Sequence, residues 1–132
     1  QKDAAVGFLA AGTWAPDMDT EANNAFTSAF EEKYGYIPGS YAMQAYDTAN
    51  LIDSAVAKLG GDMSDKDAVR AAIKAADFSS VRGDFAFNNN HYPIQDFHML
   101  KVAKRDDGKF HTSFVNTIVE DYEDSFHEEC KM

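Results

Sequence analysis

One helix organises this chain, and its sequence is Gly39-Ser-Tyr-Ala-Met-Gln-Ala-Tyr-Asp-Thr-Ala-Asn-Leu-Ile-Asp-Ser-Ala-Val-Ala-Lys-Leu-Gly-Gly61. Ser40 can cap its first turn through the hydroxyl, and the two glycines can end it because glycine accepts a left-handed conformation. Apolar residues recur at steps of three and four, which is typical of a helix with a buried stripe. The stripe consists of Ala42, Ala45, Tyr46, Ala49, Ile52, Val56 and Leu59, widened by Met43, Leu51 and Ala55. The pattern therefore predicts a helix that is mostly buried.

The first turn of this helix is the candidate binding site. Tyr41 and Gln44 lie there, where free backbone N–H groups and the positive end of the helix dipole attract negative groups. An aromatic ring with a polar tip suits ligand contact at the open end of a buried helix. Tyr41 could equally be a core or rim tyrosine, and the residue pattern alone leaves both interpretations open.

Composition limits the class of partner. The chain has 132 residues, enough for one domain with a core, and 45% of them are apolar. Twelve Lys and Arg oppose 22 Asp and Glu, so the formal net charge is −10. Such a surface repels phosphate backbones and anionic membranes, so we expect no nucleic-acid partner. No apolar run approaches the roughly 20 residues that span a bilayer.

The ends of the chain give two further expectations. The sequence begins at Gln1 rather than Met, which indicates a processed or truncated product. Cys130 is the only cysteine, so it is either free or paired with a segment that this sequence does not contain. Pairing of that kind would fit an oxidising compartment.

The first half of the chain reads as a strand followed by three helices. The apolar run 4–11 predicts a buried strand that needs cover on both faces, as in a parallel sheet. Asp19 or Thr20 can cap a helix that ends near residues 33–35. After the central helix, Ser64-Asp-Lys-Asp67 resembles a capping box for a third helix.

The second half reads as a strand and a hairpin. Residues 81–87 turn extended, and a turn at 88–90 follows. The runs 94–103 and 110–119 are strand-like, and Asp107-Gly108 between them is a hairpin signal. The acidic tail from residue 120 is expected to wrap the surface.

Catalytic and metal-binding motifs are absent from the sequence. No histidine has a second His or a Cys at metal spacing, so we predict no metal and no cofactor; the four are His91, His98, His111 and His127. His98 and His111 could face each other across the hairpin, although a solvated pair is the simpler interpretation. A small hydrolase using His91 with Asp96 remains the alternative from the enzyme class.

Several stretches together resemble one family, the solute-binding proteins of branched-chain amino-acid type ABC transporters. The resemblance covers nearly the whole chain and is closer to the branch that takes aromatic carboxylates than to the one that takes leucine. The stretches are Thr13-Trp-Ala-Pro-Asp-Met-Asp-Thr-Glu-Ala-Asn23, Lys33-Tyr-Gly-Tyr-Ile-Pro38, Tyr41-Ala-Met-Gln-Ala-Tyr-Asp47, Ser80-Val-Arg-Gly83, Phe87-Asn-Asn-Asn-His-Tyr-Pro-Ile-Gln-Asp-Phe97 and Glu129-Cys-Lys-Met132.

The resemblance implies a fold class and a division of the chain. The class is α/β, a partial type I periplasmic binding protein fold with the order strand, three helices, strand, β-hairpin. The chain would be a single fragment over residues 1–132. Residues 1–96 would belong to one lobe plus the last crossover, and residues 97–132 would form closing strands and a tail that lead to the other lobe.

The resemblance also implies a function. The chain would belong to the solute-binding component of an ABC importer, which closes two lobes on a small carboxylate ligand and delivers it to a membrane permease. Tyr41 matches the family's aromatic contact, Gln44 is its neighbour, and Trp14 could line the rim of the cleft. The expected compartment is the periplasm, or the extracellular face of a membrane. The alternative is a ligand-sensing receptor ectodomain, and the fragment alone is a possible homo-oligomer.

Overall fold

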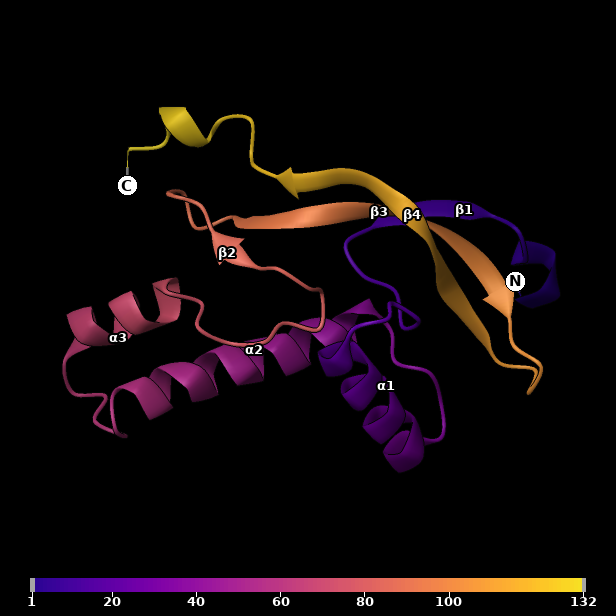
Figure 1. Cartoon of the computed structure of the whole chain (residues 1–132), viewed down its shortest axis with the longest axis horizontal. Helices are drawn as coiled ribbons and strands as arrows, with labels where there is room; N and C mark the ends of the chain where they lie inside the picture. Colours follow the sequence, from indigo (N-terminus) through magenta and orange to yellow (C-terminus); the bar gives the residue numbers. More distant parts are fainter. Residues whose placement is uncertain (1, 132) are drawn as a thin grey trace.

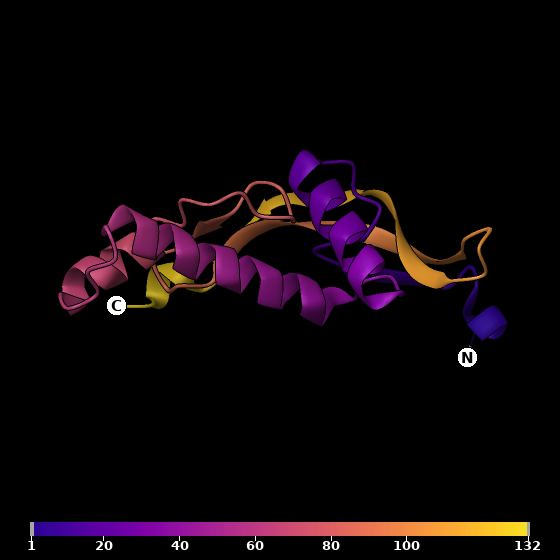
Figure 2. The ribbon, with the colours of Figure 1, turned by 90° about the horizontal axis from the view of Figure 1, so that it is seen from below.

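Antiparallel strands form one layer and three helices lie to one side of it in the computed structural model, which describes residues 2–131 (Figures 1 and 2). The elements are β1 (Leu9–Gly12), α1 (Glu21–Tyr34), α2 (Ser40–Lys58), α3 (Lys66–Lys74), β2 (Ala86–Phe87), β3 (Pro93–Lys104) and β4 (Phe110–Tyr122), with 3₁₀ turns at Lys2–Ala5 and His127–Glu129. The expected α/β class and element order are confirmed.

Strand β3 is the centre of the strand layer, because it pairs with each of the other three strands. His98 of β3 lies opposite Gly12 of β1 and also opposite Thr117 of β4. Strands β1, β3 and β4 therefore lie side by side at the level of His98. The residue opposite His111 is Ala103, so the two histidines do not face each other. His98 is also buried rather than solvated.

The hairpin between β3 and β4 forms where the Asp-Gly signal predicts it. Gly108 has a φ of 84°, the left-handed conformation that the turn requires. Beyond the turn, β4 loses its regular register with β3 at three places. Such bulges increase the local twist of the two strands.

Local chemistry sets where the helices begin, and the N-cap residues of two helices differ from the sequence prediction. The Thr20 hydroxyl accepts from the Asn23 N–H at 3.2 Å and caps α1 as expected. Asp65, rather than Ser64, caps α3 by accepting from two backbone N–H groups. The N-cap of α2 is Gly39, so Ser40 is the first helical residue and makes no cap.

The prediction of a buried strand over 4–11 is wrong in three respects. Residues 2–5 form a 3₁₀ turn, and Gly7 at a φ of 92° separates this turn from the strand. The remaining strand, β1, pairs antiparallel with β3 instead of lying in a parallel sheet. Its residues Leu9 to Ala11 are exposed in the described chain. An apolar run does not distinguish a covered strand from one whose cover lies elsewhere.

The buried face of α2 also differs from the predicted stripe. Only Met43, Asp47 and Ala55 are buried, whereas Ile52 of the predicted stripe is 50% exposed. The helix packs through the face that carries these three residues, at spacings of four and eight. Met43 and Ala55 of the predicted stripe lie on this face, and Tyr46 packs on Phe26 of α1 at 4.6 Å between ring centroids. The rest of the stripe is only partly covered by the described residues, and Ala45, Ala49 and Ile52 are exposed.

The core lies between α1, the start of α2 and the segment before β2. Trp14, Phe26, Met43 and Val81 form it. The indole N–H of Trp14 donates to the Asn23 side-chain oxygen at 2.7 Å, and the Asn23 amide donates to the Met18 carbonyl at 2.8 Å. The loop after β1 is therefore fastened to α1 by a buried polar network.

Asp47 joins the helix layer to the strand layer. This carboxylate is 2% exposed and accepts from the Ser80 hydroxyl at 2.6 Å, the Val81 N–H at 3.0 Å and the Arg82 Nε–H at 3.0 Å. Arg82 continues the link, because its Nη1 donates to Gln95 of β3 at 2.8 Å. Every donor needed to offset burial of this charge is present.

We expect Asp47→Ala to destabilise the protein by about 3–5 kcal/mol, because it leaves the largely buried Arg82 without its carboxylate. Urea unfolding of the intact protein measures the change. Asp53→Ala, on the exposed side of the same helix, is the matched control and should change stability by less than about 0.5 kcal/mol. Equal effects of the two substitutions would contradict the role given to Asp47.

A second prediction concerns residues 1–132 prepared alone. Exposed apolar side chains lie on or next to the outer strands; they are Phe8 before β1, Leu9 on β1, and Val115 and Ile118 on β4. Exposed apolar groups next to unpaired strand edges favour association. We therefore expect a homodimer or larger assembly in light scattering or ultracentrifugation. A stable monomer at roughly 10–50 µM would contradict this expectation.

Candidate functional site

The first turn of α2 presents the two candidate ligand contacts to solvent. Tyr41 is 88% exposed, and Gln44 is exposed as well. The two residues are three positions apart, so they lie on one face of the helix. Between them in the sequence, Met43 is buried in the core and holds this turn in place.

The N-terminus of α2 has no side-chain cap. Gly39 is the N-cap, and no side chain of the described residues accepts from the backbone N–H groups of this turn. A serine or aspartate at the N-cap position would occupy one of these donors, as Thr20 does at the start of α1. The turn therefore offers backbone N–H groups and the positive end of a 19-residue helix to an anionic group.

Trp14 is not at the surface with the other two. Its side chain belongs to the core cluster that contains Met43, and only 3% of the residue is exposed. The structure thus places Trp14 on the core side of the first turn of α2, whereas Tyr41 and Gln44 lie on its solvent side. Whether any of the three contacts a ligand stays a prediction.

The residues of the hydrolase alternative lie in different places. His91 lines a small groove with Arg70, Ile73, Lys74 and Phe87. Asp96 lies on β3 and accepts from the Asp121 N–H at 2.9 Å. The structure gives no contact between His91 and Asp96, so it does not support their use as a pair.

The described residues offer neither a metal site nor a membrane span. No group of three or more His, Cys, Asp or Glu residues within 2–131 is arranged to hold a metal ion. Across the same part of the chain, every helix is too short or too polar to cross a membrane.

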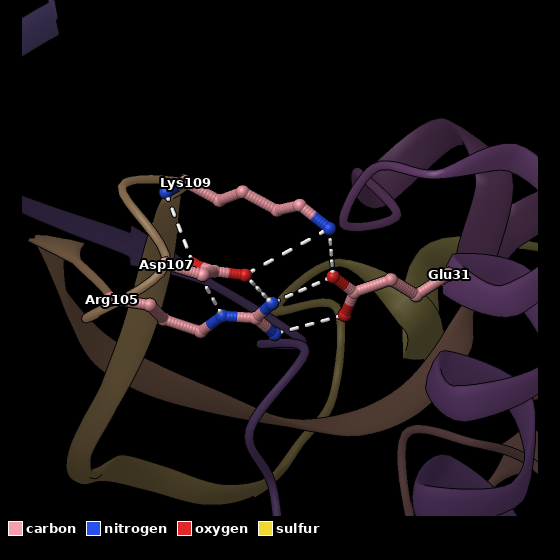
Figure 3. Close-up of polar contacts among 4 residues, drawn as sticks. All are labelled: Glu31, Arg105, Asp107 and Lys109. Atoms are coloured by element: carbon pink, nitrogen blue, oxygen red, sulfur yellow. Dashed lines mark hydrogen bonds and ion pairs between the residues drawn. The ribbon is translucent and has the colours of Figure 1, made fainter.

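One cluster of charges ties α1 to the tip of the hairpin (Figure 3). The two terminal guanidinium nitrogens of Arg105, Nη1 and Nη2, donate to the two carboxylate oxygens of Glu31 at 2.9 and 2.6 Å. Arg105 also pairs with Asp107, and Lys109 pairs with Glu31. Two cations and two carboxylates thus neutralise one another, which leaves no net charge for a ligand. The cluster is a structural tie rather than a binding site.

The comparisons with known proteins bear on this geometry. A family model described as periplasmic binding protein matches residues 1–109. The chain belongs to the periplasmic binding protein family. No curated protein matches the chain at a significant level.

Solved structures of this family share the fold. A solute-binding protein of an ABC transporter from R. palustris, in complex with benzoate, is 29% identical with a TM-score of 0.83 over 93% of this chain. A solute-binding protein from Rhodopseudomonas palustris BisB5, in complex with 3,4-dihydroxybenzoic acid, is 27% identical with a TM-score of 0.80 over 93%. A leucine-, isoleucine-, valine-, threonine- and alanine-binding protein from Brucella ovis is 18% identical with a TM-score of 0.71 over 92%.

The chain spans about one third of the length of these structures, because it covers 33%, 33% and 34% of them. The first two are similar in sequence as well as in fold. The third is too distant in sequence to show more than a common fold.

The charge cluster gives a testable dependence on pH. Hydrogen bonds from Arg105 and Lys109 lower the pKa of Glu31 from 4.5 to about 2, and a hydrogen bond from Arg105 lowers the pKa of Asp107 from 3.8 to about 2. A carboxyl with a depressed pKa stabilises the fold above its unfolded pKa, and this stabilisation is lost as the pH falls through the folded pKa. The loss should therefore occur between about pH 5 and pH 2.

We expect Glu31→Gln to lose less stability than the wild type across this pH range, since the variant has no Glu31 carboxylate to protonate. Urea midpoints at a series of pH values measure the difference. Glu32→Gln, an exposed neighbour on α1 with no ion pair among the described residues, is the control. Parallel pH profiles for wild type and Glu31→Gln would rule out the cluster as a source of acid sensitivity.

Proposed function

We propose that this chain is the C-terminal portion of the solute-binding component of an ABC importer. In the whole protein it helps to capture a small carboxylate, an aromatic acid or an amino acid, and to deliver it to a membrane permease. The observation that carries the proposal is the exposed Tyr41 on an uncapped helix N-terminus, in a chain of this family. The compartment proposed for the protein is the periplasm.

The chemistry of the first turn supports a carboxylate ligand. Backbone N–H groups at the start of α2 can donate to the carboxylate, and the Gln44 amide can orient it. The ring of Tyr41 can pack on the apolar body of the ligand. A ring-bearing acid uses both features, and the two R. palustris structures are complexes with benzoates. We therefore place aromatic acids ahead of leucine as candidate ligands.

Trp14 has a supporting part in this proposal. Its indole packs in the same cluster as Met43 and is fixed by Asn23. It can thus hold the rim of the cleft and the first turn of α2 from within the core.

The proposed division into lobes assigns residues 1–96 to one lobe plus the last crossover and residues 97–132 to the closing strands and tail. The pairing of β1, β3 and β4 at His98 supports a connection between the two lobes in this region. A hinge here would let two lobes close on the ligand.

Titration calorimetry of the full-length protein with benzoate, 4-hydroxybenzoate and leucine tests the proposal. We expect saturable binding of at least one of these carboxylates, with the aromatic acids ahead of leucine. Absence of binding for all three would overturn the assignment of the ligand class.

We expect Tyr41→Ala in the full-length protein to weaken binding of the carboxylate by about 1–3 kcal/mol, because the ring contact is lost. The fold should be retained, since Tyr41 is exposed. Calorimetry measures the affinity and circular dichroism checks the fold. Tyr92→Ala, another exposed tyrosine outside the helix, is the matched control. An unchanged affinity for Tyr41→Ala would remove this residue from the site.

A further inference from the structure

A pocket lies away from the start of α2. It has a volume of about 430 Å³, within the range of roughly 300–1,000 Å³ of small-molecule sites. Its walls come from the loop before α1, from residues 82–84 and from side chains of the paired strands β3 and β4. Neither Tyr41 nor Gln44 lines it.

The pocket is strongly acidic. Five carboxylates line it, those of Asp19, Asp84, Asp96, Glu120 and Asp121. Among the described residues, no lysine or arginine lies within 4.0 Å of any of the five. The one arginine in the wall, Arg82, already has a carboxylate partner outside the pocket in Asp47. The pocket therefore carries an excess of negative charge.

Three of the carboxylates belong to exposed residues, and they have no partner among the described residues. Asp96 already accepts from the Asp121 N–H, and Asp19 accepts from the Asn24 amide at 2.9 Å. The side chains of Asp84, Glu120 and Asp121 have no hydrogen-bond partner within the described part of the chain. Asp121 also has a φ of 48°, a left-handed conformation that few residues other than glycine adopt, and it lines the pocket together with Glu120.

His98 is an independent sign of a ligand. The residue is 2% exposed and lines the same pocket. Its Nδ1 lies 3.2 Å from the Thr117 hydroxyl, whereas its Nε2 is buried without a partner among the described residues. Burial lowers the pKa of His98, although nearby Asp96 acts in the opposite direction, and this net shift favours the neutral ring. When Nδ1–H donates to Thr117, Nε2 is an acceptor.

We propose that this pocket binds a small organic ammonium compound, whose N–H groups donate to Asp84, Glu120 or Asp121 and to His98 Nε2. The apolar part of such a compound would pack on Met18 and Phe114, which complete the wall. An amine fits better than a metal ion, because the described acidic residues do not converge as metal ligands. The inference does not depend on the carboxylate site at Tyr41.

Two probes of the same shape test the pocket in the full-length protein. Phenethylammonium carries the positive charge, and phenylacetate carries a similar apolar body with a negative charge. Titration calorimetry should show saturable binding of phenethylammonium, and phenylacetate should not compete for that binding. Absence of phenethylammonium binding would overturn the proposal, including the case in which the rest of the protein fills the pocket.

A pair of double variants separates the pocket from general surface charge. Asp84→Asn with Glu120→Gln should weaken phenethylammonium binding at least about tenfold, because two charge-assisted hydrogen bonds are lost. Asp106→Asn with Glu128→Gln removes the same charge from exposed positions outside the pocket and should leave binding unchanged. Equal losses in the two double variants would overturn the proposal. A separate benzoate titration distinguishes failure of this site from failure of the carboxylate site.

Discussion

The structure depends on one buried charge, the carboxylate of Asp47. A charge at 2% exposure is tolerated only when donors surround it, and residues 80–82 supply three of them. This fixes α2 to the segment that leads into β2, and Arg82 extends the link to Gln95 of β3. The same geometry sets where the N-terminus of α2 lies, and with it the exposed position of Tyr41.

Features governed by local chemistry could be predicted from the sequence. The cap at Thr20, the glycines after α2 and the Asp-Gly turn of the hairpin each depend on a few neighbouring residues. Burial could not be predicted in the same way. The helical periodicity of Ile52 and the other apolar residues of α2 predicts an apolar face that packs against other residues. It does not show whether those residues lie in the described part of the chain. The exposure of Leu9 on β1 has the same explanation.

The candidate sites differ in how visible they are in the sequence. Tyr41 could be located because its position relative to Gly39 marks a helix start. Trp14 and Tyr41 are both aromatic residues close to element ends, and no local signal shows that Trp14 enters the core. The pocket at His98 was missed, because its residues come from four separate segments and follow no motif spacing. Only the register of β3 with β1 and β4 brings these segments together.

The distribution of charge distinguishes the two proposed sites. Arg82, Arg105 and Lys109 are held by Asp47, Glu31 and Asp107, so none of them is available to an anionic ligand. The proposed carboxylate contact at the start of α2 uses neutral donors, because the uncapped turn offers backbone N–H groups. In the pocket at His98, by contrast, five acidic side chains line the wall, and its one arginine, Arg82, is paired with Asp47. Because backbone N–H groups attract anions and unpaired carboxylates attract cations, the two proposed sites differ in the sign of the ligand charge that they favour.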